Sequence, residues 1–183
     1  TMTTNGFLID KEMAGRVIDS GLDTLGLSLD SLKEERHDLL RGVKGVYKRI
    51  METINYFDKY TSVPPQIFIT SIIMGINACD LVELAEWVNI NKRVNFIYFQ
   101  AVMQPFAMPE DDNWHTDEQC KFLWPDADKA SCILDQLIEL KKIGYKINNS
   151  AAQLKAFKAY FKNPRQFIKK TKCNLGFNSF TVL

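Results

Sequence analysis

Hydrophobic residues follow a two-residue period in several short stretches of the chain. In "LGLSLDS", residues 25–31, three leucines alternate with small or polar residues, which indicates a strand with one apolar face. "IFITSIIMG" and "VNFIYFQAV" are nearly continuous apolar runs, as expected of strands covered on both faces. Together with "TMTT", which leads into an Asn-Gly turn signal, they predict strands near 2–5, 24–30, 66–74 and 94–101.

Helical spacing fills the intervals between these strands. Asp10 is a candidate N-cap for a helix through "KEMAGRVIDS", and Asp80 opens the helix "LVELAEWVN". After an irregular stretch at 103–128, "ILDQLIELKK" predicts a further helix, and Ser150 caps a final amphipathic one. A long helical stretch follows the second strand, with hydrophobic residues at Val46, Ile50, Ile54 and Phe57.

Strands that alternate with helices form parallel β-α-β units with right-handed crossovers. We therefore expect an α/β fold in which four parallel strands are neighbours in sequence order, with helices covering one face. No helix is predicted before the first strand, so the chain is either a small open sheet or part of a (β/α) barrel. We place this partial barrel in residues 1–147 and a C-terminal helical extension in residues 148–183.

The polar positions of "LGLSLDS" suggest a binding site. In a β/α barrel the leucines would face the helices, and Gly26 would leave room inside. Ser28 and Asp30 would then lie at the carboxyl end of the strand, where such folds place their sites. A hydroxyl and a carboxylate suit ribose hydroxyls or an amino group. The alternative is that Asp30 caps the following helix and Ser28 is a small filler.

Composition and charge exclude several classes of protein. The 183 residues include 23 Lys and Arg against 22 Asp and Glu, so no basic excess points to nucleic acid or a membrane surface. Apolar runs stay below the ~20 residues of a membrane span, and the N-terminus lacks the pattern of a signal peptide. The four cysteines form no CxxC pair, which suits reduced thiols in the cytoplasm.

These motifs, in this order, resemble the radical S-adenosylmethionine (SAM) enzymes. The resemblance lies in "TTNG", "LGLSLDS", "HDLLRG", "VYKRIMETINYF", "VNFIYFQAVMQP" and "ITSIIMGINACDLVELAEWV", the last with an Asn-x-x-Asp helix start. It implies that the chain holds strands three to six of a six-stranded partial barrel. "CNLGFNSFTV" resembles the entry into the cysteine-rich SPASM extension, where Cys173 would match a ligand of an auxiliary iron–sulfur cluster.

The resemblance implies an iron–sulfur oxidoreductase as the parent enzyme. In that family a [4Fe–4S] cluster held by CxxxCxxC gives an electron to SAM, and a 5′-deoxyadenosyl radical then abstracts hydrogen from the substrate. SPASM-type relatives imply a peptide or protein substrate. This sequence contains neither CxxxCxxC nor the glycine-rich GGE-type segment. We therefore expect an internal fragment that is inactive alone and binds neither metal nor SAM by itself.

The resemblance also implies which residues contact SAM. Ser28 is the candidate for the "S-L-D" contact, and Asp30 orients Ser28 or touches the substrate. Arg41 of "HDLLR" would bind the cofactor carboxylate with its planar guanidinium. The structural alternative makes Arg41 a solvated helix end before Gly42.

Two later strands supply the remaining candidates for SAM binding. Asn77 is either a cofactor contact or a turn residue after Gly75. The backbone from Gln100 to Val102 would lie along adenine, whereas the Gln100 side chain could instead be a buried hydrogen-bonded group.

The histidines and the loop aromatics have simpler interpretations. His37 is expected to face solvent or cap local structure, and His115 lies in a polar loop. Trp114, Phe122 and Trp124 either pack that loop onto the barrel, the preferred interpretation, or line a substrate channel.

Two other function classes stay open. One is a non-catalytic β/α module for binding or scaffolding, and the other is an unrelated barrel enzyme that uses Asp30 with a histidine. As partners we expect the small-molecule cofactor and the substrate, without nucleic acid or membrane. The open sheet edge also predicts that the chain pairs with itself, or hides this edge beneath its C-terminal helices.

Overall fold

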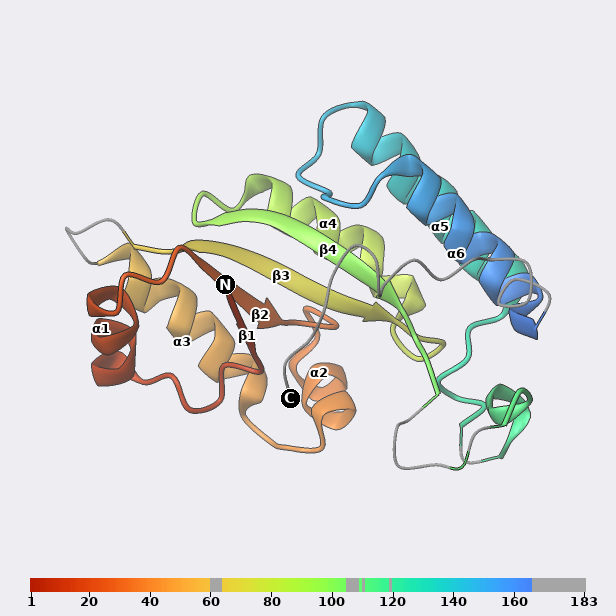
Figure 1. The fold of residues 1–183 in the computed structure, drawn as a ribbon, viewed down its shortest axis with the longest axis horizontal. Helices are drawn as coiled ribbons and strands as arrows, with labels where there is room; N and C mark the ends of the chain where they lie inside the picture. The colour runs from red at the N-terminus through yellow and green to blue at the C-terminus, as the bar shows by residue number, and fades with distance from the viewer. Residues whose placement is uncertain (60–63, 105–108, 110, 119, 166–183) are drawn as a thin grey trace, which may run out of the picture.

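The computed structural model describes residues 1–59, 64–104, 109, 111–118 and 120–165 and shows an α/β fold (Figure 1). Its strands are β1 (Met2–Thr4), β2 (Thr24–Ser28), β3 (Gln66–Ile73) and β4 (Val94–Ala101). Its helices are α1 (Lys11–Asp19), α2 (Glu34–Arg41), α3 (Val46–Asp58), α4 (Leu81–Ile90), α5 (Ala127–Lys142) and α6 (Ala151–Lys162), with the 3-10 turns η1 (Ala78–Asp80) and η2 (Trp114–Thr116).

The four strands form one sheet in the order β1-β2-β3-β4, and every pair is parallel. This confirms the predicted order, which follows because each crossover helix returns the chain to the same edge of the growing sheet. Parallel strands place all their carboxyl ends at one edge. The loops that follow β2, β3 and β4 therefore lie close to one another.

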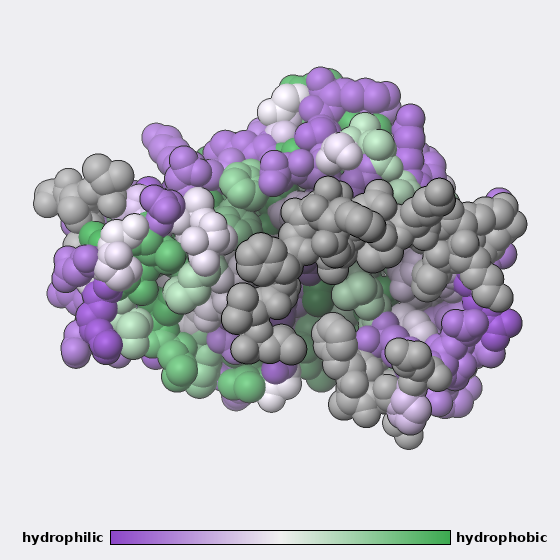
Figure 2. All heavy atoms as spheres, in the orientation of Figure 1, coloured by the Kyte–Doolittle hydropathy of each residue, from purple (hydrophilic) through white to green (hydrophobic). Residues whose placement is uncertain are grey.

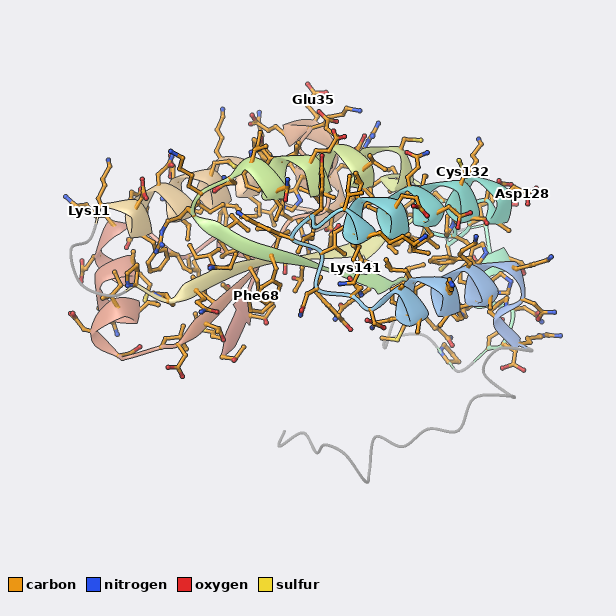
Figure 3. The ribbon with its side chains drawn as sticks, turned by 90° about the horizontal axis from the view of Figure 1, so that it is seen from above. Lys11, Glu35, Phe68, Asp128, Cys132 and Lys141 are labelled. Atoms are coloured by element: carbon orange, nitrogen blue, oxygen red, sulfur yellow. The ribbon has the colours of Figure 1, made fainter. Side chains whose placement is uncertain are left out.

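The two faces of the sheet differ in how they are covered. Leu25, Leu27 and Leu29 have no exposed surface, as predicted for residues that face the helices. The other face carries Gly26 and Ser28 of β2 beside Phe68 of β3, and Figure 3 shows Phe68 on the side away from α3 and α4. Positions on this second face are mostly half-buried. The prediction that β3 and β4 are covered on both faces is therefore wrong for the described residues, because the helices pack against one face alone.

Local sequence signals set several element ends. The carboxylate of Asp10 accepts a hydrogen bond from the Met13 amide at 2.8 Å, and the Ser150 hydroxyl accepts one from the Gln153 amide at 3.0 Å. Both N-cap predictions are confirmed. The long helical stretch after β2 is two helices, because Gly42 adopts a φ of 66° and ends α2 with a left-handed residue.

The segment after α5 extends the sheet beyond β4. Ile147 forms a parallel bridge with Ile97, and the Asn149 side chain bonds both backbone groups of Phe99, at 2.7 Å and 2.9 Å. Asn149 thus acts like one residue of a neighbouring strand. The domain boundary at 147/148 stays a prediction, although residues on both sides of it contact β4.

The irregular stretch before α5 is packed by aromatic side chains. Trp124 contacts Trp114, Tyr160 and Phe161 with ring centroids 5.2–5.6 Å apart. This confirms the packing interpretation for the two tryptophans, whereas Phe122 is 53% exposed.

Among the described helices, none has the length and apolar character that crossing a membrane requires.

The opposite edge of the sheet is β1. Helix α5 packs against α4 and α6, and Asn149 just before α6 bonds to β4, so these elements lie on the β4 side and the described helices do not cover the β1 edge (Figure 1). Figure 2 shows apolar surface gathered over the loop between β1 and α1, and Met2, Phe7 and Leu8 are among the exposed large hydrophobic residues. Pairing of the chain with itself through this edge stays a prediction.

Candidate functional site

Asp30 lies at the carboxyl end of β2 with all its polar groups engaged. Its carboxylate accepts a hydrogen bond from the Ile72 amide at 2.9 Å and pairs with Arg41 at 2.6 Å. Its own amide donates to His37 Nδ1 at 3.2 Å, and its carbonyl accepts from Asn77 Nδ2 at 2.8 Å. Lys33 is the N-cap of α2, so the alternative in which Asp30 caps that helix is wrong.

Arg41 ends α2 and turns back toward β2. Its Nη2 pairs with the Asp30 carboxylate, and its side chain is 21% exposed, so it is not a freely solvated helix end. Burial raises the pKa of Asp30, and although Arg41 and the Ile72 amide lower it, the pKa stays above its ordinary value. The Nε of Arg41 is buried and has no hydrogen-bond partner among the described residues.

His37 and Asp38 of "HDLLR" both have structural partners. The structure buries His37 completely, which corrects the expectation that it faces solvent. The Asp38 carboxylate accepts hydrogen bonds from the Gly45 and Tyr47 amides at the start of α3. Burial raises the pKa of Asp38, but these two bonds outweigh it and leave the pKa below its ordinary value.

Asn77 joins the ends of β2 and β3. Its Nδ2 donates to the carbonyls of Asp30 at 2.8 Å and Ile72 at 2.9 Å, and its Oδ1 accepts from the Met74 amide at 2.9 Å. Asn77 has no exposed surface, and both of its amide hydrogens are occupied. Asn77 therefore takes part in the site by holding Asp30. The turn alternative describes its local geometry.

Asp80 attaches the loop after β2 to the start of α4. Its buried carboxylate accepts from the Ser31 hydroxyl at 2.6 Å and from Lys33 at 2.8 Å, and it also pairs with Arg36. Burial raises the pKa of Asp80, but these bonds outweigh it, so the pKa lies below its ordinary value. Asp80 opens α4 as predicted, although its side chain makes no capping hydrogen bond.

Ser28 lies on the open face of the sheet, as the alternation predicts. Its hydroxyl is 3.5 Å from Thr70 Oγ1 on the neighbouring strand, a long contact that leaves it half-exposed. Beside it, the rings of Phe68 and Phe96 stack at 5.0 Å. A Cβ on Gly26 would lie 2.6 Å from the Phe68 ring, so the absence of a side chain at Gly26 lets this ring pack against β2.

The two candidates at the end of β4, Gln100 within the strand and Val102 just after it, differ in burial. Gln100 is exposed, so its alternative as a buried hydrogen-bonded side chain is wrong. Val102 is buried, its amide donates to Ile73 O at 3.3 Å, and its carbonyl accepts from the Tyr160 hydroxyl at 3.0 Å. Both backbone groups of Val102 are therefore occupied.

The structure joins Asp30, Arg41 and Asn77 at the carboxyl ends of β2 and β3, and Ser28 is the last residue of β2, two positions before Asp30. His37 bonds to Asp30 and Asp80 bonds to Asn77, two contacts that were not expected from the sequence. The Asn-x-x-Asp spacing was a signal for Asp80, whereas nothing local to His37 shows that it bonds Asp30. Among the described residues, no group of three His, Cys, Asp or Glu side chains could hold a metal ion.

Fold and site together define a class: a parallel β/α protein with a polar site at the carboxyl ends of its strands, where such proteins bind small molecules. Comparison with known proteins indicates the family. Residues 1–88 match the model of the radical SAM superfamily. This match over 88 of the 183 residues supports a relationship to that superfamily, and the open four-stranded parallel sheet is consistent with a partial β/α barrel.

Individual proteins resemble this chain in sequence or in fold. The mitochondrial GTP 3′,8-cyclase of Arabidopsis thaliana is 31% identical over 146 residues, 78% of this chain and 33% of that protein. GTP 3′,8-cyclase of Rippkaea orientalis is 34% identical over 105 residues, 56% of this chain and 31% of that protein. The crystal structure of Streptococcus suis SuiB shares the fold, with a TM-score of 0.56 and 17% identity over 81% of this chain and 31% of that chain. The chain spans a third or less of the curated relatives it matches.

Proposed function

We propose that this chain forms the SAM-binding part of a radical SAM enzyme. The observation that carries the proposal is the ion pair of Asp30 with Arg41 at the carboxyl end of β2, two positions after the half-buried Ser28 and within the segment that matches the family model. The carboxyl end of β2 thus offers a hydroxyl, a carboxylate and a guanidinium. These groups are complementary to the ribose, amino and carboxylate groups of SAM.

The described residues fit the amino-acid end of SAM. Arg41 uses Nη2 for Asp30, and its buried Nε has no partner, so the guanidinium keeps donors for a carboxylate. Asp30 holds the guanidinium in place, and Asn77 holds Asp30. In this proposal Ser28 and Arg41 contact the cofactor, and Asn77 is a positioning residue.

The described residues do not fit the [4Fe–4S] cluster. Cys79 lies in η1, Cys120 in the loop before α5 and Cys132 in α5, and among the described residues no three His, Cys, Asp or Glu side chains form a group that could hold a metal ion. Cys173 lies outside the described residues. The proposal therefore assigns the cluster to another segment of a longer enzyme. When bound in that longer enzyme, the cluster and SAM would supply its radical chemistry, and the residues described here would hold and orient SAM.

The proposal extends to substrate, branch and location. The resemblance of "CNLGFNSFTV" to a SPASM entry supports a peptide or protein substrate, although residues 173–182 lie outside the described part. The names of the two cyclase relatives favour a second candidate, a nucleotide. The free thiols of Cys79 and Cys132 support a cytoplasmic location.

The test begins with the gene. The proposal expects a CxxxCxxC coding segment shortly before the codon for Thr1. SAM binding by the full-length product is then measured by calorimetry in the parent protein and in the S28A, R41A and R16A variants. Ser28→Ala removes one hydrogen bond and should weaken the free energy of SAM binding by about 0.5–1.5 kcal/mol. Arg41→Ala removes a charge-assisted bond and should weaken it by about 1.5–3 kcal/mol.

Arg16 is the matched control, because it is an exposed arginine on α1, and its replacement leaves SAM binding unchanged. If Ser28→Ala and Arg41→Ala both bind SAM like the parent, the proposed contacts are wrong. If the full-length product lacks CxxxCxxC and binds no SAM, the chain belongs to a non-catalytic β/α module.

A further inference from the structure

His37 makes a hydrogen bond that fixes its protonation state. Its Nδ1 accepts the Asp30 amide at 3.2 Å, and an imidazole nitrogen that accepts carries no proton. The neutral ring therefore carries its hydrogen on Nε2, which is buried without a partner among the described residues. The Asp30 amide is itself buried, so His37 satisfies a donor that would otherwise have no acceptor.

The surroundings of His37 favour the neutral ring. Burial lowers the pKa of His37 most, the Arg41 guanidinium lowers it further, and Asp38 raises it, which brings the pKa to about 4. The Asp38 carboxylate is engaged by the Gly45 and Tyr47 amides, and the Tyr47 ring packs edge-on at 6.4 Å from the imidazole. The Asp30 carboxylate is paired with Arg41. Asp38 therefore favours the imidazolium only weakly, and burial and the Arg41 charge outweigh it.

His37 and Arg41 also share one face of α2. They are four residues apart, which places their side chains one helical turn from each other. Both contact Asp30: His37 accepts a hydrogen bond from the Asp30 amide, and Arg41 pairs with the Asp30 carboxylate. A displacement of Asp30 therefore moves the group to which the guanidinium is bound.

We propose that neutral His37 is a positioning residue for the Asp30–Arg41 pair and that protonation of its ring releases this pair. A proton on Nδ1 replaces an acceptor with a donor, which breaks the bond to the Asp30 amide. It also places a second cation beside Arg41. The pair would then lose its alignment with the carboxyl end of β2. For SAM binding, this inference rests on the proposed function above; for the geometry of the pair, it does not.

The first experiment follows the pair in this chain by NMR. His37→Asn retains an acceptor close to the position of Nδ1 and does not titrate, whereas His37→Leu fills similar space without an acceptor. We expect Nε2–H imidazole in the parent, and exchange of the Asp30 amide about tenfold faster in H37L, the equivalent of one buried hydrogen bond. H37N restores slow exchange. The Arg41 Nε–H signal is sharp in the parent and in H37N, and it broadens in H37L.

Acidification separates positioning from packing. In the parent the Arg41 signal broadens in step with protonation of His37, and in H37N it stays sharp over the same pH range. If H37L does not fold, this comparison of the parent with H37N decides alone. The inference is overturned if the Asp30 amide exchange rate and the Arg41 Nε–H line width are the same in the parent, H37L and H37N. An Nδ1–H tautomer of His37 in the parent would also overturn it.

The second experiment measures SAM affinity against pH in the full-length protein. We expect the parent to lose affinity as His37 becomes protonated and H37N to retain it. If the parent binds no SAM at any pH, the proposed function fails, while the NMR result still decides the role of His37. If the parent and H37N lose affinity together, the release by protonation is wrong.

Discussion

Replacing Asn77 tests whether one side chain joins the ends of β2 and β3. Asn77→Ala removes three hydrogen bonds, to Asp30 O, Ile72 O and the Met74 amide, each 2.8–2.9 Å long. The site has no exposed surface, so water does not replace them without opening the turn. At about 1 kcal/mol for each bond, the free energy of unfolding falls by about 3 kcal/mol. That is a large fraction of the roughly 5–15 kcal/mol typical of a domain.

Asn77→Asp sharpens the test, because it keeps the shape and the acceptor to the Met74 amide. The new carboxylate oxygen would face the carbonyl oxygens of Asp30 and Ile72, which repel it. We expect N77D to be at least as unstable as N77A at pH 7. Protonation in acid restores one donor, so N77D gains stability relative to N77A as the pH falls.

Urea denaturation followed by circular dichroism measures these changes. Asn5→Ala is the control, since the Asn5 side chain accepts one exposed hydrogen bond, from the Phe7 amide at 3.1 Å. Its replacement should change stability by no more than about 0.5 kcal/mol. A loss below about 1 kcal/mol in N77A, or an N77D protein as stable as the parent at pH 7, would refute the reasoning.

Three further predictions follow from other parts of the fold. His37 has a pKa near its ordinary 6.5 in the unfolded state and about 4 in the folded state, so the unfolded state binds the proton first as the pH falls. The free energy of unfolding therefore decreases between these two values, by about 2.5 kcal/mol at pH 4.5. Urea titrations at several pH values check this against H37N, which should lack that component. Gly75→Ala should cost more stability than Gly26→Ala, since the Cβ at 75 meets backbone oxygens at 2.7 Å and 2.9 Å, while at 26 it meets chiefly a ring that can move; thermal melts that rank G26A as the less stable would contradict this. Met2→Lys on the edge strand should reduce self-association in sedimentation experiments, and an unchanged sedimentation profile of an associating parent would exclude the β1 edge as the contact.

The sequence by itself determined the elements and their order. The alternation in residues 25–31 identified β2 and the face of each residue, because side chains of a strand alternate between the two sides of a sheet. The alternation of strands and helices determined the parallel order β1-β2-β3-β4 through the handedness of crossovers. Asp10 and Ser150 marked helix starts, since an N-cap depends on residues only three positions away.

The tertiary structure decided the partners of the polar residues. Asn77 meets Asp30 across 47 positions and Asp80 meets Ser31 across 49, so no local spacing could predict either contact. The same holds for His37, whose full burial depends on the packing of α2 against the end of β2. Local patterns are encoded in neighbouring residues, whereas a hydrogen bond between distant residues exists only after the sheet brings their strand ends together. That is why Ser28, Asp30, Arg41 and Asn77 could be named as candidates from the sequence, whereas the bonds that join Asp30 to Arg41, Asn77 and His37 could not.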